Sequence, residues 1–187
     1  SVYLSAGRVL HAHRKVYLPT YSMFEESRYW AAGSDIRAFD APFGRAGILT
    51  CEDVWHPSTS YLLFVDRADV VITPSASPAR GVTLDPADDG RSELVPGSTA
   101  TWNGLLRNQS AAFNLYSIYV NRAGVEDGIS FSGHSQVVDP FGRVVVSLGI
   151  DAEQVTAELD PSVLKRKRQT VPMLRDEKID VTLGNLE

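Results

Sequence analysis

The one cysteine of the chain, Cys51, occupies a position that suits a nucleophile. It follows the apolar run 46–50 and precedes Pro57, where a helix is expected to begin. A sharp turn between a strand and a helix holds a side chain at the C-terminal edge of a sheet, where active sites of α/β folds lie. Backbone N–H groups of such a turn favour a thiolate and can bind an oxyanion. The pattern therefore indicates acyl transfer at Cys51.

Two carboxylates follow this cysteine directly, Glu52 and Asp53. They have no packing purpose beside an inert buried cysteine, which is the alternative interpretation. Their charges oppose a thiolate by like-charge repulsion, so activation requires a cation, and Lys15 is the candidate. We expect Asp53 to be structural and to bind amides of the turn.

Three segments carry a resemblance to a known family: His-Arg-Lys-Val-Tyr-Leu-Pro at 13–19, Phe-Glu-Glu-Ser-Arg-Tyr-Trp at 24–30, and Gly-Ile-Leu-Thr-Cys-Glu-Asp-Val-Trp-His-Pro at 47–57. They resemble the signature blocks of the nitrilase superfamily of carbon–nitrogen hydrolases, in which a Glu–Lys–Cys triad hydrolyses C–N bonds through a thioester acyl-enzyme. The resemblance implies that Cys51 is the nucleophile and Lys15 the lysine of the triad. By spacing, Glu26 rather than Glu25 matches a further site glutamate, which orients Lys15 or the substrate.

The resemblance also implies which residues surround the substrate. The backbone N–H of Glu52 would complete an oxyanion hole, and Trp55 and His56 would shape the pocket wall. Pro-Ser-Ala-Ser-Pro at 74–78 resembles the loop that lines the pocket and supplies Ser75 and Ser77. Later blocks at 120–124, 131–135 and 138–142 extend the match over almost the whole chain. The blocks are most similar to the glutamine-amidase domains of NAD synthetases, which favours a small-molecule amide substrate over a nitrile.

Composition excludes several other classes of protein. Hydrophobic residues make up 43% and charged residues 22%, as in ordinary globular domains. The net charge of −5 does not favour a nucleic-acid partner, and no apolar run is long enough to span a membrane. The basic run 165–168 is interpreted as the solvated face of a short helix. A single cysteine fits a reducing compartment, so we expect a cytoplasmic protein.

The hydrophobic pattern predicts an α/β or α+β layered fold. In the first half of the chain we expect a hairpin of strands 2–4 and 8–10 that continues to residue 15, strands at 36–39 and 46–50, a helix at 57–67 and a strand at 69–73 ended by Pro74. A long polar lid or binding loop at 75–98 follows. The second half is expected to contain a helix at 99–114, a strand at 116–121, a hairpin at 136–146, a last strand at 155–159 and an extended tail at 170–187.

The family resemblance implies a four-layer α-β-β-α sandwich that forms homodimers or higher homo-oligomers, with the helix at 102–114 and the tail at 170–187 as candidate contacts. No cofactor is implied. The family's general base is a glutamate upstream of the lysine, and none of the 14 residues before Lys15 is Glu. We therefore expect residues 1–187 to be the larger, C-terminal part of a hydrolase domain whose N-terminal strands are missing, and nearly inactive alone.

Three alternatives remain open from the residues. A Cys–His acyl hydrolase would use His56, the histidine nearest to Cys51 in the sequence. A catalytically inactive, nitrilase-like interaction module would explain the absent glutamate. A metal site could use His11 and His13 on one strand face, but no third ligand of the right kind lies near them, so we predict no metal.

Overall fold

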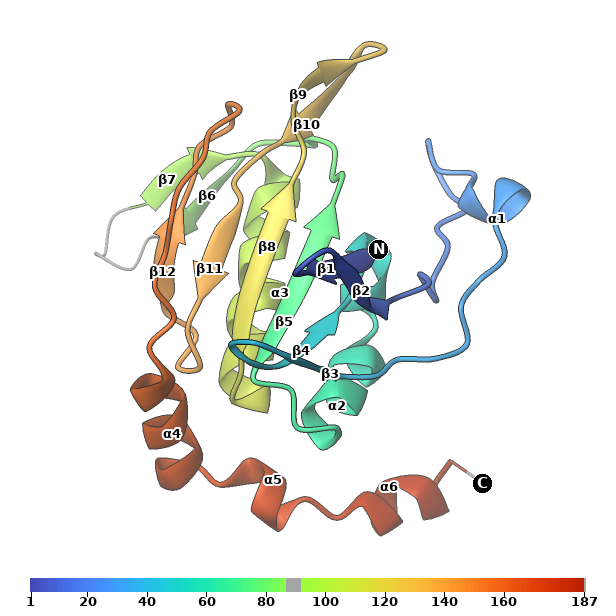
Figure 1. The fold of residues 1–187 in the computed structure, drawn as a ribbon. Coiled ribbons are helices and arrows are strands. Elements are labelled where there is room, and N and C mark those ends of the chain that lie inside the picture. Colours follow the sequence, from blue (N-terminus) through green and yellow to red (C-terminus); the bar gives the residue numbers. More distant parts are fainter. Residues whose placement is uncertain (87–91, 187) are drawn as a thin grey trace.

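A six-stranded mixed sheet forms the centre of the molecule (Figure 1). The computed structural model describes residues 1–86 and 92–186. Strands β4, β5 and β8 run parallel to one another, and β3, β11 and β12 extend the sheet in antiparallel pairing. In spatial order the strands are β12 (Val144–Ser147), β11 (Gln136–Val138), β8 (Tyr116–Asn121), β5 (Val70–Ser75), β4 (Gly44–Ile48) and β3 (Phe39–Ala41).

Two helices cover one face of this sheet, α2 (Pro57–Val65) and α3 (Gly97–Phe113). Leu63 of α2 and Trp102 and Leu106 of α3 are buried in one cluster with Val71 and Tyr119 of the sheet. Burial of such large side chains contributes about 2 kcal/mol each. This core fixes the position of the strand ends, where the predicted site lies.

The opposite face of the sheet is covered in part by a hairpin of β1 (Val2–Ser5) and β2 (Arg8–Ala12). Tyr3 of the hairpin packs against a second cluster formed by Phe39, Ala46 and Ile48. The layers are thus helices, main sheet and hairpin. The hairpin and the layered α/β fold confirm the sequence predictions, although β2 ends at Ala12 and does not reach Lys15.

The predicted strand at 155–159 is wrong, because these residues join no strand ladder. Val155, Ala157 and Leu159 instead line a hollow against Val137 and Val146 on the face of the sheet opposite the helices. Alternating apolar residues indicate that one side of a segment faces the protein. Here packing covers Ala157 and Leu159 in part, without strand pairing, and Val155 stays exposed.

Pro74 does not end its strand, as the sequence suggested, but lies within β5 and pairs with Val120 of β8. The neighbour on the other side, β4, reaches only as far as the pair of Ile48 with Ile72. Beyond Ile72, β5 pairs with β8 and no longer with β4. Residue 74 therefore needs no backbone N–H on the edge that faces β4. A proline is tolerated where a strand edge is free.

The polar stretch 75–98 contains regular structure that the sequence analysis did not predict. Strands β6 (Thr83–Pro86) and β7 (Ser92–Val95) pair as a hairpin, and residues 87–91 between them lie outside the described part of the chain. A further hairpin, β9 (Ala123–Glu126) and β10 (Ile129–Ser132), was also not predicted. Each strand has four residues, so the hydrophobic pattern is short, although Phe131 and Ser132 of β10 are buried.

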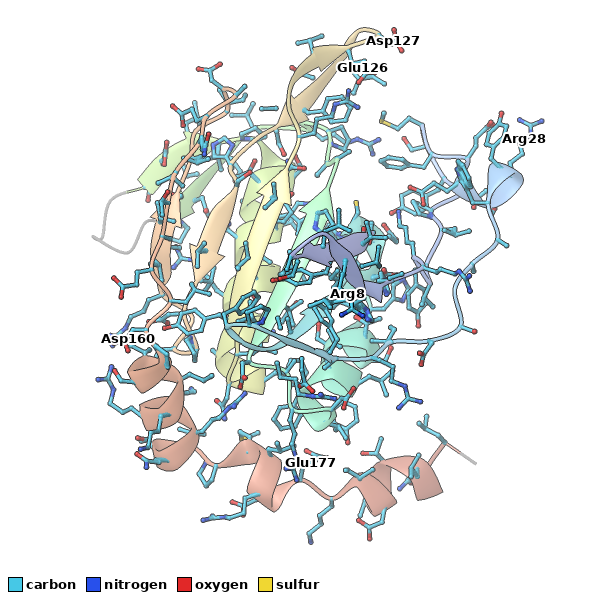
Figure 2. All side chains as sticks on the ribbon, viewed as in Figure 1. Arg8, Arg28, Glu126, Asp127, Asp160 and Glu177 are labelled. Atoms are coloured by element: carbon cyan, nitrogen blue, oxygen red, sulfur yellow. The ribbon has the colours of Figure 1, made fainter. Side chains whose placement is uncertain are left out.

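The tail is helical and not extended, contrary to the prediction for 170–187. After α4 (Pro161–Thr170) come α5 (Met173–Asp176) and α6 (Ile179–Gly184). The basic run lies in α4 as expected, but Arg168 pairs with Asp69 at 2.6 Å. Tyr61 of α2 donates a hydrogen bond of 2.8 Å to Glu177, which anchors the tail beneath α2 (Figure 2). In residues 1–86 and 92–186, no helix has both the length and the apolarity for a membrane crossing.

Candidate active site

Cys51 lies at a sharp turn at the C-terminal end of β4. Its backbone φ is +50°, in the left-handed region that a non-glycine residue adopts at a cost of about 1 kcal/mol or more. A short 3₁₀ helix, η1 (Cys51–Trp55), begins at this residue and leads into α2. The hydroxyl of Ser75, at the end of the neighbouring β5, donates a hydrogen bond to Sγ at 3.3 Å. The turn therefore presents the sulfur between two parallel strand ends.

Asp53, which is fully buried, anchors this turn on the side that faces the protein interior. Its carboxylate accepts hydrogen bonds from the backbone N–H groups of Thr50, Val16 and Tyr17 at 2.9–3.0 Å, and it lies 2.8 Å from Nε2 of His13. Burial alone would raise the pKa of Asp53, but these hydrogen bonds outweigh it and hold the pKa below its usual value. The carboxylate is thus ionised and joins the segment 13–17 to the Cys51 turn.

This junction positions Lys15, which lies directly before Val16. The ammonium contacts both carboxylate oxygens of Glu26 at 2.7 and 2.6 Å, and the Lys15 side chain is only 14% exposed. Glu26 begins α1 (Glu26–Tyr29), and its own N–H donates to the carbonyl of Pro19. Glu25 instead pairs with Arg28 at the surface.

A cavity of about 300 Å³ opens above Cys51. Of the residues expected at the site, Cys51, Glu52, Trp55 and Ser77 line it. The other expected residues, Lys15, Glu26, His56 and Ser75, are absent from the lining. Of these, Ser75 contacts the sulfur directly. The wall also holds residues that the sequence analysis missed, among them Tyr21, Phe24, Arg80 and Trp102.

Trp102 and Ser77 form a rigid back wall of the cavity. The indole N–H of Trp102 donates to the Ser77 hydroxyl at 3.0 Å, and the ring of Trp55 meets Trp102 edge-on with centroids 5.5 Å apart. Trp102 is 2% exposed, although it lies on a helix distant in sequence from Cys51. The helical spacing predicts only that it is buried, so nothing in the sequence assigns it to this cavity.

Tyr119 lies in β8 and brings a buried phenol toward the same sulfur. Burial raises its pKa first of all, the hydroxyl groups of Ser75 and Ser77 lower it, and charge on Cys51 raises it further. Within the described residues its oxygen makes no hydrogen bond of good geometry. The phenol thus lies near the hydroxyls of Ser75 and Ser77 and near the sulfur of Cys51.

At the mouth of the cavity, Tyr21 and Glu52 form a second polar contact. The phenol of Tyr21 donates to the Glu52 carboxylate at 2.7 Å. Burial and this hydrogen bond raise the pKa of Tyr21 to about 12, so the phenol stays protonated near neutral pH. The Glu52 side chain therefore faces the cavity mouth.

The histidines take other places. His56 stacks on Tyr17 with ring centroids 3.4 Å apart and is not among the residues that line the cavity. His11 stacks on Phe39, whereas His13 is engaged by Asp53. In the part of the chain that the structure describes, no group of three or more His, Cys, Asp or Glu residues could hold a metal ion.

Comparison with known proteins decides the family to which this geometry belongs. The family model "carbon-nitrogen hydrolase" matches residues 2–169. The chain belongs to the carbon-nitrogen hydrolase family. This confirms the predicted nitrilase-superfamily resemblance, and the tail beyond residue 169 lies outside the match.

Individual relatives of this carbon-nitrogen hydrolase agree. An omega-amidase of Saccharomyces cerevisiae is 29% identical over 181 residues, which is 94% of this chain and 57% of the relative. A glutamine-dependent NAD(+) synthetase of Aquifex aeolicus is 26% identical over 87% of this chain and 26% of its own length. The crystal structure of a carbon-nitrogen hydrolase from Helicobacter pylori superposes with a TM-score of 0.83 at 26% identity, covering 97% of this chain and 62% of that one. The chain thus spans less than two thirds of each of these relatives.

Proposed function

We propose that the protein containing this chain hydrolyses a non-peptide C–N bond of a small amide through a thioester on Cys51. One observation supports this most directly. Asp53, two residues after Cys51, accepts the N–H of Val16, one residue after Lys15. A fully buried carboxylate thereby ties a cysteine in a strained turn to a lysine that is itself held by Glu26. An inert cysteine would not require this arrangement.

In the proposed reaction Sγ of Cys51 attacks the amide carbon, and the C=O electrons move to oxygen as a tetrahedral oxyanion. Lys15 and the backbone N–H of Glu52 stabilise that charge. The C–N bond then breaks, and ammonia or an amine leaves with an added proton. Water attacks the resulting thioester, the C–S bond breaks, and a carboxylic acid and the free thiol are released. Glu26 orients Lys15 throughout.

The proton transfers require a positioned carboxylate, which contributes roughly 10²–10⁴-fold to the rate. The family resemblance gives this role to a glutamate upstream of the lysine, and residues 1–14 contain none. Since the chain spans 57% of the yeast omega-amidase, we assign the complete reaction to the full-length protein.

Neither rival is favoured by the contacts at the site. A Cys–His hydrolase needs its imidazole against the sulfur, but the ring of His56 stacks on Tyr17, and no hydrogen bond joins it to Cys51 within the described residues. An inactive interaction module would not require a left-handed cysteine with a hydroxyl donor at 3.3 Å from its sulfur.

Ammonia release from a panel of small aliphatic amides tests the proposal on the full-length protein. Replacement Cys51→Ala should reduce release at least ~10³-fold, because no other nucleophile replaces the sulfur. Mass spectrometry of the wild-type protein after rapid quenching should show the acyl adduct on the peptide containing Cys51. The matched control is Ser58→Ala in α2, which should leave the rate unchanged. Ammonia release that survives Cys51→Ala would refute the proposal.

A further inference from the structure

From the sequence, His13 and His11 shared one role, as possible metal ligands, but the structure gives their rings different surroundings. His13 is 5% exposed, and its Nε2 lies 2.8 Å from Oδ2 of Asp53. The ring of His11 stacks on Phe39, and its Nε2 is buried without a hydrogen-bond partner among the described residues. His13 is therefore bonded to the carboxylate that anchors the Cys51 turn, whereas His11 is not.

The two oxygens of the Asp53 carboxylate divide their contacts between the two segments that carry the site. Oδ1 accepts the backbone N–H groups of Val16 and Tyr17 at 3.0 and 2.9 Å. Oδ2 accepts the N–H of Thr50, the N-cap of η1, at 3.0 Å, and it also contacts the ring of His13. His13 thus binds the same oxygen that fixes the start of the nucleophile turn.

Lys15 lies between two contacts with this carboxylate. His13, two residues before it, contacts Oδ2 of Asp53 through its side chain. Val16, the residue after it, donates its backbone N–H to Oδ1. The carbonyl of Lys15 itself accepts the N–H of Gly33 at 2.8 Å. The backbone that carries the ammonium is therefore fixed before, at and after Lys15, and the contact before it depends on the His13 ring.

The Asp53 carboxylate determines which ring nitrogen of His13 carries a hydrogen. It is ionised, so it only accepts hydrogen bonds, and Nε2 of His13 must donate. A hydrogen bond to a carboxylate is stronger than one between neutral groups. The two side chains are 2% and 0% exposed, so water does not replace this donor. Its loss would leave the buried carboxylate with an unfilled acceptor position and shift it toward its remaining donors.

We propose that His13 is a positioning residue that acts through Asp53 to hold Lys15 in a constant position relative to Cys51. The inference rests on the proposed hydrolysis, in which Lys15 stabilises the oxyanion formed when Cys51 attacks the amide. His13 is not among the residues that line the cavity, so its effect should appear in kcat and not in KM. A displacement of about 1 Å in such a site can lower a rate by about 10²-fold.

The test measures steady-state ammonia release by the full-length protein from the amide of the panel that it hydrolyses fastest. His13→Leu removes the donor and should lower kcat by about 10- to 100-fold, with KM changed by no more than about twofold. His13→Gln returns an N–H group near the position of Nε2 and should recover kcat to within about fivefold of wild type. The matched control is His11→Leu, which removes the neighbouring imidazole and should change kcat by no more than about twofold.

Three results would overturn the role of His13. They are an unchanged kcat in His13→Leu, a loss that His13→Gln does not restore, and an equal loss in His11→Leu. Thermal unfolding checks that each variant folds. If His13→Leu does not fold, His13→Asn takes its place, because the shorter side chain does not extend to Asp53 and should cause the same loss of kcat.

Alkylation of the thiol separates this inference from the proposed hydrolysis, because it needs no amide turnover. The ammonium of Lys15 favours the reactive thiolate, so displacement of Lys15 should slow the modification of Cys51. Mass spectrometry of the peptide containing Cys51 should show reaction with iodoacetamide at least about fivefold slower in His13→Leu and within about twofold of wild type in His11→Leu. If no amide is hydrolysed, the proposed function fails, and these rates alone decide the role of His13. Equal rates in wild type and His13→Leu would then overturn it.

Discussion

The two sides of the Cys51 turn are built in opposite ways. On the inner side, Asp53 is fully buried and accepts hydrogen bonds from three backbone N–H groups, and it contacts His13. On the outer side, the Glu52 carboxylate accepts a hydrogen bond from the phenol of Tyr21, its one donor among the described residues. The two carboxylates are adjacent in sequence, so their different surroundings come from the fold and not from their type.

In the proposed reaction, this difference would separate the residues that hold Cys51 from the residues that contact the substrate. On the inner side, hydrogen bonds fix the position of the Asp53 carboxylate, which suits a group that must hold Lys15 and Cys51 in a constant relative position. The outer side carries exposed and partly exposed residues, among them Tyr21 and Arg80, on loops. Substitutions there should alter the substrate, whereas those on the inner side should alter the rate or the stability.

The largest effect should follow from Lys15→Ala, which removes the cation from the inner side. We expect kcat for amide hydrolysis to fall about 10²–10⁴-fold, because the oxyanion loses its charged partner. His56→Ala should reduce it by less than about tenfold, since His56 stacks on Tyr17 and only supports the wall. Steady-state ammonia release measures both. A tolerated Lys15→Ala together with an inactive His56→Ala would indicate a Cys–His hydrolase instead.

The next effect concerns the anchor itself. Asp53→Asn replaces two acceptor oxygens by one and places an amide N–H₂ against buried donors. We expect the free energy of unfolding in urea to fall by about 3 kcal/mol. Asp35→Asn at the exposed pair with Arg37 is the control and should cost less than about 0.5 kcal/mol. Equal costs at the two positions would show that Asp53 does not anchor the turn.

The same anchor predicts how stability depends on pH. The pKa of Asp53 is held below its usual value of 3.8, so the unfolded chain takes up the proton first. The stabilisation is therefore complete above about pH 4 and is lost as the pH falls through the lowered pKa. Urea unfolding between pH 6 and pH 3 should show the gap between wild type and Asp53→Asn narrowing on acidification. A gap that is constant or widens would contradict the assignment.

The smallest effect tests the unpartnered phenol of Tyr119. Tyr119→Phe removes a buried hydroxyl that makes no hydrogen bond within the described residues. The free energy of unfolding should stay the same or rise by up to about 1 kcal/mol, because no bond is lost and a desolvated polar group is removed. Tyr116→Phe is the matched control, since the Tyr116 phenol donates to the carbonyl of Asp160 at 3.0 Å. A clear loss at Tyr119 alone would reveal a hydrogen bond to the site.

Much of the fold could be predicted from the sequence where a segment is regular and buried on one side. Strand 116–121 was predicted with the bounds of β8, and the helices at 57–67 and 99–114 differ from α2 and α3 by a few residues at their ends. The segment 155–159 has the same kind of alternation but pairs with no strand, since periodicity reports burial and not hydrogen bonding. The hairpin of β9 and β10 was missed because each strand has four residues and none of those in β9 is buried.

The sequence by itself determined which residues could do the chemistry. The order of the blocks around Lys15, Glu26 and Cys51 indicated the family, because those types and spacings are rare together. Only the tertiary structure decided which residues surround them. Arg80 and Trp102 lie in segments that are distant from Cys51 along the chain, and no local pattern marks them as neighbours of the sulfur. These residues lie close to Cys51 because parallel strands end side by side and a helix packs behind them. Both are long-range contacts, which a local sequence pattern does not encode.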